Sequence, residues 1–91
     1  MEKQSHFENV LRCKWSSAVL SQINKGIKQP GELLRSIPGL TKKVLYQRLK
    51  KLERFKYIHR RLINKKPLKV FYTLTPRGRK ASNIIKMVRA L

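Results

Sequence analysis

The fold is decided by residues 40–57, which read LTKKVLYQRLKKLERFKY. Leu45, Leu49 and Leu52 recur at the i, i+4, i+7 spacing that aligns side chains along one face of an α-helix. Thr41 precedes this run as an N-cap, whose hydroxyl can accept from a free backbone N–H. The face opposite the leucines is polar and mostly cationic, with Lys42 and Tyr46 on one flank, and consists of Lys43, Gln47, Lys50 and Arg54. The stretch therefore predicts a helix over 41–56 with one face for its own domain and one for a partner.

A second, shorter helix is predicted immediately before this one. Pro30 suits the first turn of a helix, and Leu33, Leu34 and Ile37 supply an apolar face. Residues 36–39, which read SIPG, indicate a turn, because proline fixes φ and glycine tolerates positive φ. Residues 30–57 are thus predicted to form a helix-turn-helix, whose second helix can enter a DNA groove.

Upstream, the spacing of Trp15, Ala18, Val19 and Ile23 predicts a helix from about Lys14 to Asn24. We expect Gly26 to end this helix in a left-handed cap, and Trp15 to be a core residue. Residues 27–29 are short and are expected to add an edge strand. Residues 1–13 are expected to form an N-terminal arm with a short helix over 6–11.

Downstream, residues 58–63 and 69–74 are rich in β-branched and aromatic residues that partly alternate with polar ones, which predicts two strands. A polar hinge over 64–68 contains Pro67. Residues 58–74 are therefore expected to form a hairpin, that is, a wing beside the helix-turn-helix.

Thr75 and Pro76 predict the start of a last helix over 75–91. Its apolar stripe consists of Ala81, Ile84, Ile85, Val88 and Leu91. The stripe either closes the domain's own core or, as we favour, forms a dimer contact together with the N-terminal helix, since two-fold pairing suits DNA half-sites. The predicted fold class is mostly α with a small β-hairpin, as a single domain over 1–91.

The charge balance points to a polyanionic partner. The 91 residues include 23 Lys and Arg against four acids, a formal net charge of +19. Residues 42–69 hold one acid, Glu53, and twelve cations: Lys42, Lys43, Arg48, Lys50, Lys51, Arg54, Lys56, Arg60, Arg61, Lys65, Lys66 and Lys69. An ordinary solvent-exposed face carries both acidic and basic side chains. The near absence of acids here therefore favours a partner with negative charge. No apolar run approaches the roughly 20 residues that span a bilayer, and no signal peptide is evident, so we expect a soluble, cytoplasmic, nucleoid-associated protein without membrane contact.

The predicted partner is double-stranded DNA. In the major groove, Gln47 can pair with adenine and Lys43 with guanine, while Tyr46 can contact a phosphate or a thymine methyl. The wing cations are expected on flanking phosphates or in the minor groove. The predicted DNA-binding residues are Thr41, Lys42, Lys43, Tyr46, Gln47, Lys50, Lys51, Arg54, Arg60, Arg61, Lys65, Lys66 and Lys69.

Three motifs together resemble the HxlR-type winged helix-turn-helix regulators, relatives of the MarR group. The motifs are Lys14-Trp15 at a helix start, then IPGLTKKVLYQRLKKLE, then VFYTLTPRGRKA. The resemblance implies a homodimer, built from the terminal helices, that binds a pseudo-palindromic operator and regulates transcription. Some members sense electrophiles with a cysteine whose place here falls near Glu2, so no sensing role is assigned to Cys13. The glycine-containing turn after the recognition helix is replaced by Arg54-Phe55-Lys56-Tyr57.

Other functions are less well supported. The sequence has no Asp, no paired carboxylates and no phosphate-binding glycine loop, so no catalytic, cofactor or metal site is predicted, and the chain is not expected to be an enzyme. The sequence leaves open whether a small-molecule effector, or a redox signal at Cys13, is sensed. An architectural protein that coats DNA remains the main alternative. An RNA- or ribosome-binding protein is a weaker one, because Trp15, Phe55 and Phe71 are expected in the core rather than exposed for base stacking.

Overall fold

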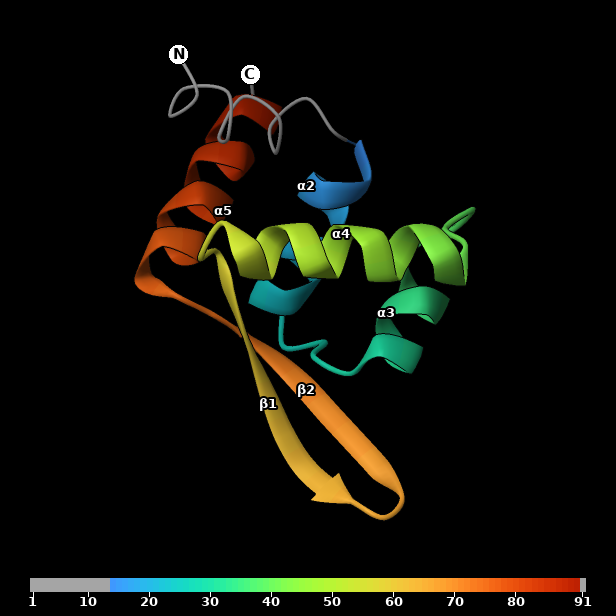
Figure 1. Ribbon diagram of the computed structural model, residues 1–91. Helices are drawn as coiled ribbons and strands as arrows, with labels where there is room; N and C mark the ends of the chain where they lie inside the picture. The colour runs from blue at the N-terminus through green and yellow to red at the C-terminus, as the bar shows by residue number, and fades with distance from the viewer. Residues whose placement is uncertain (1–13, 91) are drawn as a thin grey trace.

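The computed structural model describes residues 14–90 (Figure 1). The short helix expected over 6–11, Cys13 and Leu91 lie outside this part of the chain. The described elements, in chain order, are α2 (Lys14–Asn24), α3 (Pro30–Ser36), α4 (Lys42–Arg54), β1 (Ile58–Lys65), β2 (Leu68–Leu74) and α5 (Pro76–Arg89). In Figure 1, α4 crosses the front of the helical body and the β1–β2 hairpin projects below it. This is the winged helix-turn-helix arrangement that the sequence predicts.

The helix-turn-helix is formed by α3 and α4 with a tight turn between them. Gly39 has φ +82°, and the amide of Leu40 donates to the carbonyl of Ile37 at 3.2 Å. The turn therefore spans residues 37–40, one residue later than expected, because Pro38 and Gly39 occupy its two central positions. Thr41 caps α4 as predicted, and its hydroxyl accepts from the amide of Val44 at 3.3 Å.

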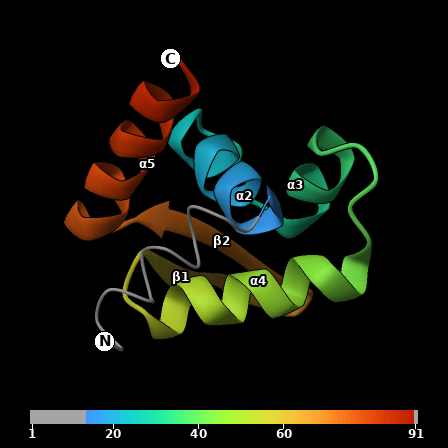
Figure 2. The same ribbon diagram turned by 90° about the horizontal axis from the view of Figure 1, so that it is seen from above.

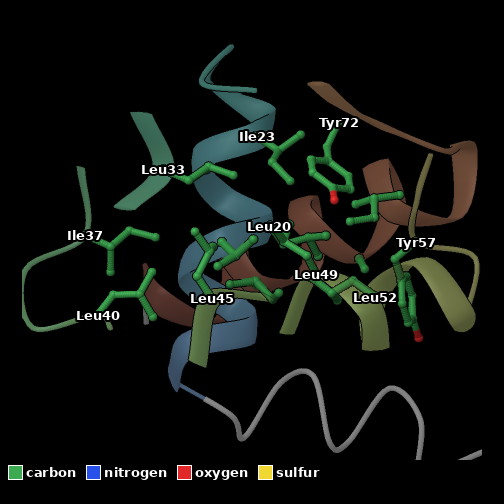
Figure 3. Close-up of a cluster of buried hydrophobic side chains, with 14 residues drawn as sticks. Leu20, Ile23, Leu33, Ile37, Leu40, Leu45, Leu49, Leu52, Tyr57 and Tyr72 are labelled. Carbon is green, nitrogen blue, oxygen red and sulfur yellow. The ribbon is translucent and has the colours of Figure 1, made fainter. Parts of the chain in front are cut away.

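The core lies where α4 rests on α2. Leu45, Leu49 and Leu52 of α4 lie around Leu20 of α2 (Figure 3). The buried apolar side chains are Val19, Leu20, Ile23, Leu33, Ile37, Leu40, Leu45, Leu49, Leu52, Tyr57, Ile58, Tyr72, Ala81 and Ile85. Each buried leucine contributes roughly 1.5–3 kcal/mol to stability. This packing fixes α4 by its leucine face and leaves its other face outside.

The apolar face of α2 differs slightly from the predicted stripe. Val19 and Ile23 are buried as expected and Leu20 joins them, whereas Trp15 and Ala18 are half-buried against the core. At the end of α2, Gly26 has φ +104° and its amide donates to Ile23, while the amide of Ile27 donates to Gln22. These two bonds are a Schellman cap, so the predicted end of the helix is confirmed.

The hairpin spans the predicted residues 58–74, but its two strands are longer than predicted. Asn64 and Lys65 belong to β1 and Leu68 begins β2, so only Lys66 and Pro67 remain between the strands. The strands are antiparallel with an irregular register between Leu62 and Asn64. The polar residues 64 and 65 carry no strand signal in the sequence, but pairing across the hairpin extends the strand through them.

Two further predictions are wrong, one about a strand over residues 27–29 and one about Phe71 in the core. Residues 27–29 form no strand, although the amide of Tyr72 donates to the carbonyl of Lys28 at 2.9 Å, and the sheet has two strands among the described residues. Phe71 is half-buried on the face of β2 opposite to Tyr72 and does not enter the core. The alternation of a strand places neighbouring side chains on opposite faces, and Tyr72 takes the inner one.

The last helix joins the wing through a compact set of hydrogen bonds. The Thr75 hydroxyl accepts from the amide of Gly78 at 2.9 Å and donates to the carbonyl of Lys56 at 2.6 Å. A Cβ atom at Gly78 would overlap the carbonyl oxygen of Tyr57, so this position requires glycine. Farther along α5, Arg89 donates to the Ser17 hydroxyl at 2.9 Å. None of the described helices has the length and apolar composition needed to cross a bilayer.

Candidate nucleic-acid interface

The outer face of α4 is cationic and exposed. Lys43, Gln47, Lys50 and Arg54 lie on the side of the helix opposite the buried leucines, and all four are exposed. Thr41 and Lys42 are exposed at the start of the helix. No acid lies on this outer face, so the helix presents mainly hydrogen-bond donors and positive charge to any partner that approaches it.

Two cations of α4 have a different environment. Lys51 is half-buried, unlike the other predicted DNA-binding residues, and it has an interaction partner within the protein. Arg48, which was not among the predicted site residues, is also half-buried, and its Nε atom is buried without a hydrogen-bond partner among residues 14–90. Both lie on the flank of the helix opposite to Tyr46, between the outer and the buried face, and the charge pattern alone does not distinguish this flank from the outer face.

The wing lies beside the other flank of α4. Tyr46 is 41% exposed, and with Leu68 and Val70 it lines a recess between the start of α3 and the wing. A neighbouring recess of about 340 Å³ continues along α4 and is lined by Tyr46, Lys50, Glu53, Arg60, Leu68, Val70 and Tyr72. Recognition helix and wing thus form two sides of one concave surface.

A polar cluster occupies the base of this concave surface. Arg60 pairs with Tyr72 across the hairpin, and both line the recess together with Glu53. Burial raises the pKa of the Tyr72 phenol, the nearby Arg60 opposes this effect, and Glu53 adds to it. Glu53 is the one acid that the sequence places between Lys42 and Lys69. Reasoning from helical spacing missed this cluster, because it forms only when the wing folds against α4.

The far part of the wing is cationic and partly apolar. Arg61, Lys65, Lys66 and Lys69 are exposed, as is Arg60 nearer to the base. The Asn64 amide nitrogen donates to the carbonyl of Lys66 at 3.3 Å and its oxygen accepts from the amide of Lys66 at 3.4 Å, which holds the loop. Leu62, Ile63 and Leu68 are exposed by 47%, 52% and 66%. These apolar side chains were not predicted to belong to the interface.

The structure therefore brings twelve of the thirteen predicted site residues to exposed positions on α4, its N-cap and the wing, and Lys51 to a half-buried one. On α4 they form a helical face of the size and polarity that a major groove admits, and on the wing they form a projecting cationic hairpin.

Comparison with known proteins identifies the family. The family model described as HxlR-like helix-turn-helix matches residues 10–91. The HTH-type transcriptional regulator sll1512 of Synechocystis sp. is 38% identical over 80 residues, which are 88% of this chain and 59% of that protein. The HTH-type transcriptional regulator YtcD of Bacillus subtilis is 37% identical over 81 residues, which are 89% of this chain and 64% of that protein. The chain thus spans less than two thirds of the length of these two curated relatives.

Solved structures agree with the sequence comparison. A crystal structure of the HTH-type regulator YtcD is similar with a TM-score of 0.84 and 33% identity, covering 99% of this chain and 90% of the other. A MarR-family transcriptional regulator from Porphyromonas gingivalis W83 gives a TM-score of 0.82 and 34% identity, covering 98% and 84%. The sequence motifs, the winged fold and these likenesses agree. The chain belongs to the HxlR-like helix-turn-helix family.

Proposed function

We propose that the protein is a DNA-binding transcription regulator that places α4 in the major groove and the β1–β2 wing on the adjacent backbone or minor groove. The observation that carries the proposal is the exposed, acid-free outer face of α4 beside a cationic wing. Relatives named as HTH-type transcriptional regulators support it. Such a protein acts on DNA in the cytoplasm, so we place it at the bacterial nucleoid.

The proposed base contacts come from the first turns of α4. Gln47 can accept from and donate to adenine, and Lys43 can donate to guanine N7 or O6. Tyr46 lies at the flank toward the wing, where its ring can contact a thymine methyl and its hydroxyl a phosphate. Thr41 and Lys42 stand at the exposed N-terminal end, where the helix dipole favours phosphate.

Backbone contacts come from the remaining cations. Lys50 and Arg54 are exposed on the outer face, while Lys51 is half-buried and reaches phosphate only from the edge of the helix. On the wing, the proposed contacts are Arg60, Arg61, Lys65, Lys66 and Lys69. The exposed Leu62, Ile63 and Leu68 favour the minor groove for the far part of the wing, because minor-groove binders use apolar side chains beside cationic ones.

A homodimer is part of the proposal. Ala81 and Ile85 of α5 are buried in the domain, but Ile84, Met87 and Val88 are exposed by 44%, 68% and 47%. These three side chains lie along one side of α5 that residues 14–90 leave exposed. A second copy of the chain that covers them would place two copies of α4 on one duplex.

A specific observation also supports a second function, that of an architectural protein with little base readout. The described residues include 21 cations and two acids, so attraction to any phosphate backbone is strong. This alternative uses the same helix and wing but requires no hydrogen bonds to base edges.

A competition titration separates the two functions. The protein is titrated with duplex from its own upstream region and with random duplex, at several salt concentrations. A regulator binds the upstream duplex about 10³-fold or more tightly than random duplex, and Gln47→Ala reduces this ratio. Lys66→Gln weakens both duplexes alike and lowers the salt slope by about 1. Equal binding of both duplexes along one steep salt slope would establish the architectural function instead.

The dimer has its own test. Light scattering measures the mass of the wild type and of Val88→Glu at low protein concentration, with Lys86→Glu as a matched control on another side of α5. We expect twice the 10.8 kDa chain mass for the wild type and the control, and the single-chain mass for Val88→Glu. A wild-type mass of 10.8 kDa at concentrations where DNA is bound would contradict the dimer.

A further inference from the structure

A basic recess lies on the side of the domain away from α4. It has a volume of about 350 Å³ and is lined by Ile23, Asn24, Lys25, Gly26, Lys28, Thr73, Leu74 and Arg79. These residues come from the end of α2 and the turn after it, the end of β2 and the first turn of α5. Figure 2 shows the C-terminal end of α2 and the helix α5 across the body of the domain from α4.

The recess is suited to an anion. Lys25, Lys28 and Arg79 are all exposed, and no acid is among the lining residues. Within residues 14–90, the side chains of these three cations make no ion pair or hydrogen bond. Asn24 and Thr73 add neutral donors at the same place. The negative end of the α2 dipole is weak here, because the amides of Gly26 and Ile27 already cap the last carbonyls.

The described residues outside the proposed DNA interface also carry a large excess of cations over acids. Beyond residues 42–69, the described chain has one acid, Glu32, and nine cations: Lys14, Lys25, Lys28, Arg35, Arg77, Arg79, Lys80, Lys86 and Arg89. A single duplex on α4 and the wing leaves these charges uncompensated, and a compact chain with such an excess repels itself. A second polyanion on the opposite side relieves this repulsion.

The recess stays accessible in the proposed dimer. On α5, Arg79 lies five, eight and nine residues before Ile84, Met87 and Val88, which places it about 140°, about 80° and about 180° around the helix axis from them. Lys86 follows Arg79 by seven residues and lies on the same side. The apolar strip and the basic side of α5 thus face different directions, so a partner on one leaves the other open.

We propose that this recess binds the phosphate backbone of a second duplex, so that the protein holds two DNA segments together. Lys25, Lys28 and Arg79 each neutralise a phosphate. No side chain of the recess contacts a base edge, so this binding does not depend on the DNA sequence. This inference rests on the proposed binding of a first duplex to α4 and the wing. It adds a bridging activity that neither α4 nor the wing accounts for.

A capture assay with two duplexes tests the inference. Protein is bound to an immobilised upstream duplex, and the capture of a fluorescent random duplex is measured against salt. The test variant combines Lys25→Gln, Lys28→Gln and Arg79→Gln. The matched control, Lys14→Gln, Arg35→Gln and Lys80→Gln, removes the same charge from exposed positions that do not line the recess. Thermal melting verifies that both variants fold.

We expect the wild type and the control to capture the second duplex and the test variant to lose that capture. With three phosphate contacts fewer, the salt slope for capture falls by about 2.7. Equal capture by the test variant and the control would overturn the inference, since the second duplex would then be held by the partner's recognition helix. Binding of the first duplex without any second capture by the wild type would also overturn it. Absence of first-duplex binding would instead refute the proposed function.

Discussion

The hydroxyl of Thr75 lies 2.6 Å from the carbonyl oxygen of Lys56 and donates a hydrogen bond to it. Through this bond the end of the recognition helix, the base of the wing and the start of α5 are held together, although 19 residues separate the two partners. The same hydroxyl accepts from the amide of Gly78 as the N-cap of α5. One hydroxyl therefore links the end of α4 to the start of α5, the two helices that are proposed to contact DNA and a second copy of the chain.

Replacing this hydroxyl is expected to destabilise the domain. Thr75→Val removes the cap and leaves the Lys56 carbonyl without its partner, which together cost about 2–3 kcal/mol. Thr41→Ala is the matched control, because Thr41 caps α4 at an exposed site where water replaces the lost bond, and about 1 kcal/mol is expected. Urea denaturation measures both changes. Equal losses for the two variants would mean that the bond from Thr75 to Lys56 adds nothing.

Gly78 is expected to tolerate no side chain. In Gly78→Ala the added methyl group would overlap the carbonyl oxygen of Tyr57, so the start of α5 must move away from the wing, at a cost of at least about 2 kcal/mol. Gly31→Ala is the control in another helix, since a Cβ there meets only the Arg35 side chain at 3.6 Å. That change is expected to be neutral or to stabilise by up to about 1 kcal/mol. Thermal melting of both variants checks the prediction, and a Gly78→Ala protein as stable as the wild type would contradict it.

The environment of Tyr72 predicts a loss of stability at high pH. Burial raises the pKa of this phenol in the folded state above its unfolded value of 10.0. The folded state therefore holds the proton more tightly, so the stabilisation is complete below pH 10 and is lost as the pH rises through the folded pKa. Denaturation with urea between about pH 9 and pH 12 should show a smaller loss for Tyr72→Phe than for the wild type, because the lysines titrate alike in both. An identical loss in both proteins would contradict the assigned burial effect.

The sequence predicted the elements whose signals are local. The leucine spacing of α4, the caps at Thr41 and Thr75, and the Pro38-Gly39 turn each act within a few residues, and the structure confirms them. The strand patterns and the Thr75-Pro76 start signal predicted the wing and the last helix in order, and the family motifs agreed with that order. Together these signals predicted the fold and the family correctly.

Features that depend on distant contacts were not predicted. The strands extend through Asn64 and Lys65 because of cross-strand pairing, and Phe71 faces outward because Tyr72 takes the inner position. The cluster of Glu53, Arg60 and Tyr72 joins α4 to both strands. The run of charge placed Lys51 among the predicted phosphate contacts, whereas neighbouring parts of the fold half-bury it. The roles of the thirteen predicted contact residues on DNA remain predictions.

At the end of α4, a lysine adopts a backbone conformation that favours glycine. Lys56 has φ +68° and is the left-handed residue of a Schellman cap, in which its amide donates to Glu53 and the amide of Tyr57 donates to Leu52. Glycine takes this conformation without the steric cost that a Cβ atom brings. Lys56→Gly is therefore expected to raise the free energy of unfolding by about 0.5–1 kcal/mol.

This gain should come without a loss of DNA binding, since Lys56 is not among the proposed contacts and Thr75 bonds to its backbone only. Lys50→Gly is the matched control, because it places glycine inside α4, costs about 1 kcal/mol of stability and removes a proposed phosphate contact. Urea denaturation and a salt-dependent DNA titration are measured on both variants. If Lys56→Gly were as destabilising as Lys50→Gly, the left-handed cap would not be strained. If it lowered the DNA salt slope by about 1, Lys56 would have to be added to the interface.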